Sequence, residues 1–156
     1  MNLLAVGKKP YYLSFAVFNY EKRSLKKWGI VYFTKKDTND RIIEIRKCIQ
    51  ELLTETTPAI LVTHWVDLER TLKKDLENMF QIKTLLREEC IDRKIIYNEF
   101  KTLGWEKKIT NQTKPSKKAK ILIAKQYSKM IDNVEIADAI ILGEGVVYNR
   151  LQVGRD

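Results

Sequence analysis

The pattern of apolar and polar positions at the start of the chain predicts three short strands joined by tight turns. An apolar run at residues 3–6 ends at a glycine and a Lys-Lys-Pro turn signal. Residues 12–19 and 26–33 are both rich in aromatic and β-branched side chains, and a short turn separates them. Successive strands with such short connections favour an antiparallel meander.

From residue 40 the apolar positions take the period of a helix. Asp40 is the expected N-cap of a helix over 40–56, and the stripe that the helix buries is Ile42, Ile45, Ile49, Leu52 and Leu53. The pattern then predicts a buried strand, a long helix, another strand and a short helix, at residues 59–62, 67–90, 94–97 and 100–108.

The last third of the chain predicts two more helices. Residues 110–116 have loop composition, and Ser116 is expected to cap a basic helix over 117–130. That helix is expected to bury Ile121, Leu122, Ala124 and Tyr127. The order β-β-β-α-β-α-β-α-α predicts a single α/β domain over residues 1–156, with a mixed five-stranded sheet of three antiparallel then two parallel strands. Helices on both faces of such a sheet make a ribonuclease-H-like architecture.

The terminal helix, expected over residues 134–148, is apolar on nearly every face, which is typical of a helix packed on more than one side. Glu135 and Asp138 are three positions apart and therefore neighbours on this helix. Two carboxylates on a mostly buried face repel each other unless a cation, a proton or a basic side chain joins them. The plainer interpretation is that acids in a first helical turn complement the helix dipole.

Composition and charge narrow the classes of partner. The chain has 44% hydrophobic and 31% charged residues and a net charge of +9, which favours a polyanionic partner. Residues 101–125 hold eight lysines and a single acid, Glu106. No apolar run is long enough to span a membrane, and the start lacks the pattern of a secretory signal, so a cytoplasmic, intracellular protein is expected. Cys48 and Cys90 fall in helical patterns and suit a reducing compartment.

The segments together resemble the RuvC-like Holliday-junction resolvases, particularly the small phage-encoded members. The resemblance covers nearly the whole chain. It rests on the order and spacing of five segments, at residues 4–6, 13–18, 60–62, 100–108 and 134–143, and the last of these carries the most weight.

This resemblance implies a nuclease centre in which four acids hold two divalent metal ions that activate water and stabilise the leaving oxygen. Glu135 and Asp138 match the acid pair of the last helix. Gly7 stands where the first-strand aspartate is expected, and His64 where the fourth-strand glutamate is expected. Mg²⁺ binds imidazole poorly, whereas a softer metal could take His64, Glu135 and Asp138 as ligands. The plainer interpretation of His64 is a histidine at a strand end that bonds to backbone or to an acid.

The family's late loop and helix contact phosphate through basic residues. The matching candidates here are Lys107, Lys108, Lys114, Lys117, Lys118 and Lys120. Lys117 or Lys118 could also neutralise the acid pair where metals would sit. Tyr11, Tyr12 and Trp65 flank the expected cleft and could stack on unpaired bases.

Resolvases of this family are dimers, so the resemblance also implies a homodimer. The long helix over 67–90 would contribute to its interface, although the core would claim the same residues, namely Leu72, Leu76, Met79 and Leu86.

Three hypotheses follow. The leading one is a RuvC-like, virus- or phage-encoded protein that binds branched or double-stranded DNA and whose nuclease centre is degenerate, a pseudoenzyme without a cofactor. The second is an active endonuclease for branched DNA that uses Mg²⁺ or Mn²⁺. The third is a scaffold that uses the fold for contacts with other proteins.

Overall fold

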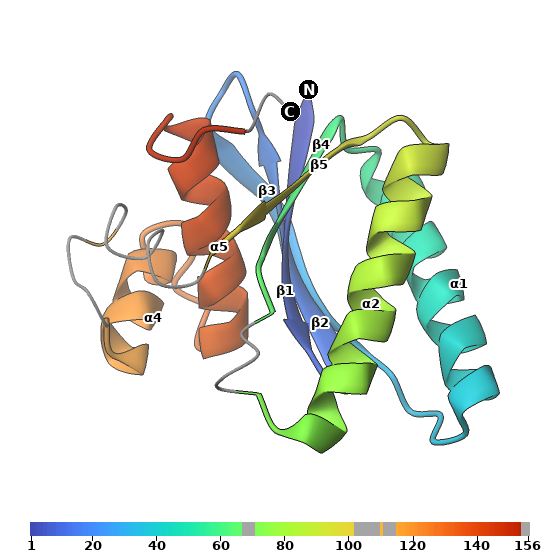
Figure 1. Ribbon diagram of the computed structural model, residues 1–156. Helices are drawn as coiled ribbons and strands as arrows, with labels where there is room; N and C mark the ends of the chain where they lie inside the picture. Colours follow the sequence, from blue (N-terminus) through green and yellow to red (C-terminus); the bar gives the residue numbers. More distant parts are fainter. Residues whose placement is uncertain (67–70, 102–109, 111–114, 154–156) are drawn as a thin grey trace.

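A computed structural model of the chain describes residues 1–66, 71–101, 110 and 115–153 (Figure 1). Its centre is a five-stranded sheet with the strand order β3-β2-β1-β4-β5. The strands are β1 (Asn2–Lys9), β2 (Tyr12–Asn19), β3 (Ser24–Tyr32), β4 (Ile60–His64) and β5 (Ile96–Phe100). β1 pairs antiparallel with β2 and parallel with β4, so the sheet is mixed in the predicted way, and the fold is ribonuclease-H-like.

Within the described residues, four helices cover the two faces of this sheet, and the elements follow the predicted order. They are α1 (Thr38–Thr56), α2 (Lys73–Asp92), α4 (Lys117–Lys125) and α5 (Val134–Val147). The N-cap of α1 is Asp37, whose side chain accepts from the backbone of Asn39 and Asp40, so the expected cap at Asp40 was wrong by three positions. Ser116 caps α4 as expected.

The two faces of the sheet carry separate apolar cores. The residues of β1 alternate between them, as a strand requires. Leu4 and Val6 pack with α1 and α2, whereas Leu3 and Ala5 pack with α4 and α5. In Figure 1 the two helix layers lie on opposite sides of the sheet.

Helix α5 approaches the sheet very closely, and one glycine makes this possible. A Cβ atom at Gly143 would lie 2.4 Å from the ring of Phe18 and 3.3 Å from the Cβ of Ala5. Phe18 has no exposed surface, so its ring has little room to move. The helix is therefore held flat against β1 and β2.

Some side chains differ from the sequence expectations. Leu122 was expected in the core but is 59% exposed on α4. The residue of α4 that is fully buried is Ala124. Leu72 is 63% exposed as the N-cap of α2. Phe100 ends β5 instead of beginning a helix, and the rest of the helix expected over 100–108 lies outside the described residues except Lys101. No helix in the described ranges has the length and apolar content that crossing a membrane requires.

The contact of Gly143 predicts a graded loss of stability. Gly143→Ala should destabilise the protein by about 1–3 kcal/mol in chemical denaturation, because the added methyl group overpacks a closed contact. Gly29→Ala is the matched comparison. Its Cβ would meet the ring of Phe15 at 3.0 Å, so the loss should be smaller. Equal or reversed effects of the two substitutions would contradict this account of α5.

Candidate functional site at the carboxyl ends of β1 and β4

β1 and β4 are parallel, so their carboxyl ends meet at one edge of the sheet, and the first turn of α5 lies over that edge. The position of a Cβ on Gly7 is 3.9 Å from the backbone oxygen of Glu135. The N-terminal strand therefore lies beside the terminal helix, as the resemblance requires. All four expected acid positions are at or near this edge, since His64 ends β4 and Asp138 follows Glu135 by one helical turn.

The space beside Gly7 is already filled. A Cβ on this residue would lie 2.5 Å from Oγ of Ser14, its cross-strand partner on β2. Ser14 is itself buried at 2% exposure. A carboxylate at position 7 would therefore have to displace Ser14.

Glu135 lies beside a residue of the sheet. The phenol of Tyr12 on β2 lies close enough to the carboxylate of Glu135 for the two groups to interact. Burial raises the pKa of Tyr12, and the negative charge of Glu135 raises it further. The carboxylate thus has a neutral partner that is fixed by the sheet.

Asp138 is bound by a cation. Nζ of Lys120 lies 2.8 Å from Oδ1 of Asp138, and both side chains are largely buried, at 14% and 28% exposure. The sequence suggested Lys117 or Lys118 for this role, but both are exposed on α4. Lys120 instead reaches across from α4 to α5.

His64 is a neutral imidazole in a positively charged environment. Burial lowers its pKa to about 3, and the charges of Lys8, Lys9 and Lys120 add to the shift. A neutral ring nitrogen can bind a metal ion. The three lysines, however, repel any cation that approaches it.

These residues do not fit the metal centre that the resemblance implies. Within the described ranges, no three side chains of the types His, Cys, Asp and Glu gather closely enough to hold a metal ion. Glu135 and Asp138 are neighbours, but both are engaged, and His64 does not complete a set with them. A divalent ion at this edge would have to displace Lys120 and enter a field of like charge.

The phosphate-binding candidates are described only in part. Lys117 and Lys118 are exposed in the first turn of α4, and Lys120 lies one turn further. Lys107, Lys108 and Lys114 lie outside the described residues. Of the candidate aromatic residues, Tyr11 and Trp65 are 57% and 43% exposed.

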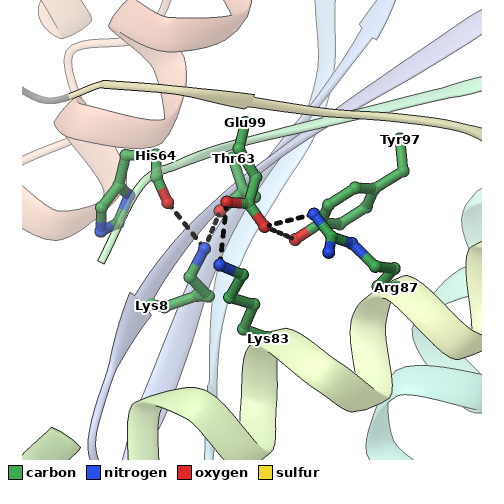
Figure 2. A network of polar contacts seen from close by, with 7 residues as sticks. All are labelled: Lys8, Thr63, His64, Lys83, Arg87, Tyr97 and Glu99. Carbon is green, nitrogen blue, oxygen red and sulfur yellow. Dashed lines mark hydrogen bonds and ion pairs between the residues drawn. The ribbon is translucent and has the colours of Figure 1, made fainter. Parts of the chain in front are cut away.

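A second polar centre lies on the other face of the same edge, around Lys8 (Figure 2). Lys8 has no exposed surface. Its Nζ donates to Oγ1 of Thr63 at 2.9 Å and to the backbone oxygen of His64 at 2.7 Å. Burial lowers the pKa of Lys8 to about 7. The negative charge of Glu99 raises this pKa, but the positive charges of Lys83 and Arg87 lower it. This buried amine holds the end of β4 against β1.

Glu99 on β5 is the acid of this second centre. Its carboxylate is 4% exposed and lies 3.3 Å from Nζ of Lys83 and 3.4 Å from Nη2 of Arg87, both on α2. The hydroxyl of Tyr97 donates to it at 2.7 Å. Nζ of Lys83 also lies 4.2 Å from the ring centre of Trp65. Figure 2 shows the His64 ring pointing away from this cluster, so only its backbone connects the two centres.

The second centre was not expected from the sequence. The signal was the alternation Leu4, Val6, Lys8, which places Lys8 on the buried face if β1 extends past Gly7. The predicted strand stopped before that point.

The comparisons with known proteins agree with the fold. No protein-family model and no curated protein matches the chain. Among solved structures, RuvC of Thermus thermophilus matches with a TM-score of 0.77 and 12% identity over 96% of each chain. RuvC of the same organism in complex with a Holliday-junction substrate matches with a TM-score of 0.78 and 11% identity, over 96% of this chain and 95% of that one. The fowlpox virus Holliday-junction resolvase matches with a TM-score of 0.61 and 13% identity, over 96% and 99%. The chain thus has the ribonuclease-H-like fold of these resolvases, as the resemblance predicted.

The lowered pKa of Lys8 predicts a pH dependence of stability. Because the folded state releases this proton near pH 7 and the unfolded chain near 10.5, the unfolded state binds more protons between these values. Stability should therefore rise with pH in this window. Relative to Lys8→Met, the wild type should gain up to about 3 kcal/mol in the free energy of unfolding between pH 7 and pH 9.5.

Urea denaturation at several pH values measures this difference. Lys9→Met removes the exposed neighbour instead and should leave the slope unchanged. Parallel stability curves for the wild type and Lys8→Met would contradict the assignment.

Proposed function

We propose that this chain is a RuvC-like nucleic-acid-binding protein whose nuclease centre is degenerate. It would bind branched or double-stranded DNA without cutting it. The expected intracellular setting in a virus or phage stays a prediction of the sequence.

The ion pair between Lys120 and Asp138 carries the proposal. Two-metal phosphodiester cleavage needs a cage of carboxylates that compensates about four positive charges. Here a lysine 2.8 Å from Asp138 supplies the positive charge from within the protein. Mg²⁺ dehydrates reluctantly and prefers carboxylate and carbonyl oxygens, so the remaining ligands would not compensate the loss of a partly buried ion pair.

Charge and fold support DNA as the partner. The net charge is +9, and α4 presents Lys117 and Lys118 to solvent beside the candidate site. The structure of Thermus RuvC with a Holliday-junction substrate has the same fold, with a TM-score of 0.78. Lysines at such a surface bind phosphates and release counterions, which makes the affinity depend on salt.

Binding without cleavage is the expected result with a labelled four-way junction. Gel-shift titrations in EDTA, Mg²⁺ and Mn²⁺ should give equal affinities, and denaturing gels should show no symmetric nicks. Lys117→Glu combined with Lys118→Glu should weaken binding by about tenfold or more at moderate salt and flatten the salt dependence. Lys47→Glu, a matched change on exposed α1 at the other face of the sheet, should have little effect.

Two outcomes would overturn the proposal in different ways. Symmetric nicks that disappear in Asp138→Asn would establish an active endonuclease with an altered metal set. A complete lack of DNA binding at low salt would favour the scaffold hypothesis.

We also infer a homodimer that forms through α1 and α2. Met79 and Leu86 are buried in the core, so they are not available to a partner. A groove of about 340 Å³ between the two helices remains open, lined by Ile42, Glu77, Phe80, Gln81, Thr84 and Leu85. Phe80 is 38% exposed at this groove and is the apolar side chain that a second copy would cover.

Phe80→Glu should therefore convert a dimer into a monomer in light scattering coupled to gel filtration, because it places a charge in an apolar contact. Leu122→Glu on α4 introduces the same charge at a 59% exposed leucine on the opposite face and should leave the mass unchanged. A wild type that is monomeric at high micromolar concentration would disprove the dimer.

A further inference from the structure

A row of three cross-strand neighbours lies at the sheet edge next to the candidate site. Lys9 on β1 pairs with Tyr12 on β2, and Tyr12 pairs with Tyr32 on β3. Paired residues on adjacent strands project from the same face of the sheet. Lys8 faces α2, so Lys9 and its cross-strand partners project from the other face, where the charge of Glu135 on α5 acts on Tyr12.

The two tyrosines form a surface that is set in place before any ligand arrives. Their ring centres are 5.7 Å apart and the ring planes are tilted by 50°. Tyr12 lies beside Glu135, and the ring of Tyr32 packs against the ring of Tyr12. Tyr32 is 64% exposed and ends the edge strand β3, so no further strand covers it.

The row also carries a positive charge at one end. Lys9 is exposed at the β1 end of the row. Glu135 on α5 is an acid next to the row, and its charge raises the pKa of Tyr12. An aromatic surface beside a lysine matches the chemistry of a nucleobase with an adjacent phosphate.

We propose that the Lys9–Tyr12–Tyr32 row is a platform for an unpaired nucleobase, which stacks on Tyr32 while Lys9 contacts an adjacent phosphate. Base faces within a duplex are covered by their neighbours, so only a single strand, a flap or an open junction offers a free face. This inference rests on the proposed nucleic-acid binding and specifies which part of the DNA this edge contacts.

The chain supplies a matched control for Tyr32. Tyr11 is 57% exposed at the same end of the sheet, but the guanidinium of Arg41 on α1 lies 5.4 Å from its ring centre. Tyr11 therefore packs toward the opposite helix layer. Tyr11 and Tyr32 have similar exposure but project toward opposite faces of the sheet.

The test measures fluorescence anisotropy of a labelled oligo-dT of about 15 nucleotides and of a blunt duplex of about the same charge. Tyr32→Leu should weaken oligo-dT binding by about tenfold and leave duplex binding unchanged. Tyr32→Phe keeps the aromatic face and should bind normally, as should Tyr11→Leu. Circular dichroism and thermal melting establish that each variant is folded.

A second measurement uses the wild type alone. An oligonucleotide with 5-iodouracil in place of one thymine is crosslinked by light, and the modified peptide is located by mass spectrometry. The crosslink should map to Tyr32 or Tyr12.

The outcomes separate the platform from the proposed function. Unchanged oligo-dT binding in Tyr32→Leu, or crosslinks only at other segments, would overturn the platform while DNA binding stands. Equal losses for oligo-dT and duplex would also overturn it, since stacking on a free base cannot affect a closed duplex. If the wild type binds neither probe at low salt, the proposed function itself fails.

Discussion

The close contact between α5 and the first two strands determines the rest of the candidate site. Gly143 lets the helix approach until its backbone meets Phe18 and Ala5, and no residue with a Cβ fits there without a shift. This approach fixes the height and rotation of the first helical turn. Glu135 and Asp138 are consequently held at the sheet edge, where their partners come from β2 and α4.

The same edge of the sheet carries polar centres on both faces. On the α5 face the acids are matched by Tyr12 and Lys120. On the α2 face the side chains of Lys8 and Glu99 are buried beside Lys83, Tyr97 and the half-exposed Arg87. The backbone of His64 joins them, because its oxygen accepts from Lys8 while its ring faces the other way. Each face thus influences the other: the charge of Lys8 contributes to the low pKa of His64.

The order and type of the described elements could be predicted because they follow from periodicity and turn residues alone. The position of the acid pair on the terminal helix followed from the same pattern. Details that depend on packing between elements could not be predicted. Lys120, not Lys117 or Lys118, meets Asp138 because the rotation of α4 against α5 decides which side chain points inward. Leu122 is exposed for the same reason.

The buried centre around Lys8 was hidden from sequence analysis by a different cause. Its members come from β1, β4, β5 and α2, which are far apart along the chain, and only the parallel pairing of β1 with β4 and β4 with β5 brings them together. A lysine two residues before a proline is also most simply interpreted as part of a turn. The burial of such a charge depends on a carboxylate that lies 91 positions away, at Glu99.

Rebuilding a metal cage at this edge would require several changes that depend on one another. A glutamate at position 64 would stand in the field of Lys8, Lys9 and Lys120, and these lysines would pair with it before a metal could. An aspartate at position 7 would first have to displace Ser14. Removing Lys120 alone would leave Asp138 partly buried and without its counterion. If the proposed function holds, the lysines at this edge oppose divalent ions more strongly than the lack of acids at positions 7 and 64 does.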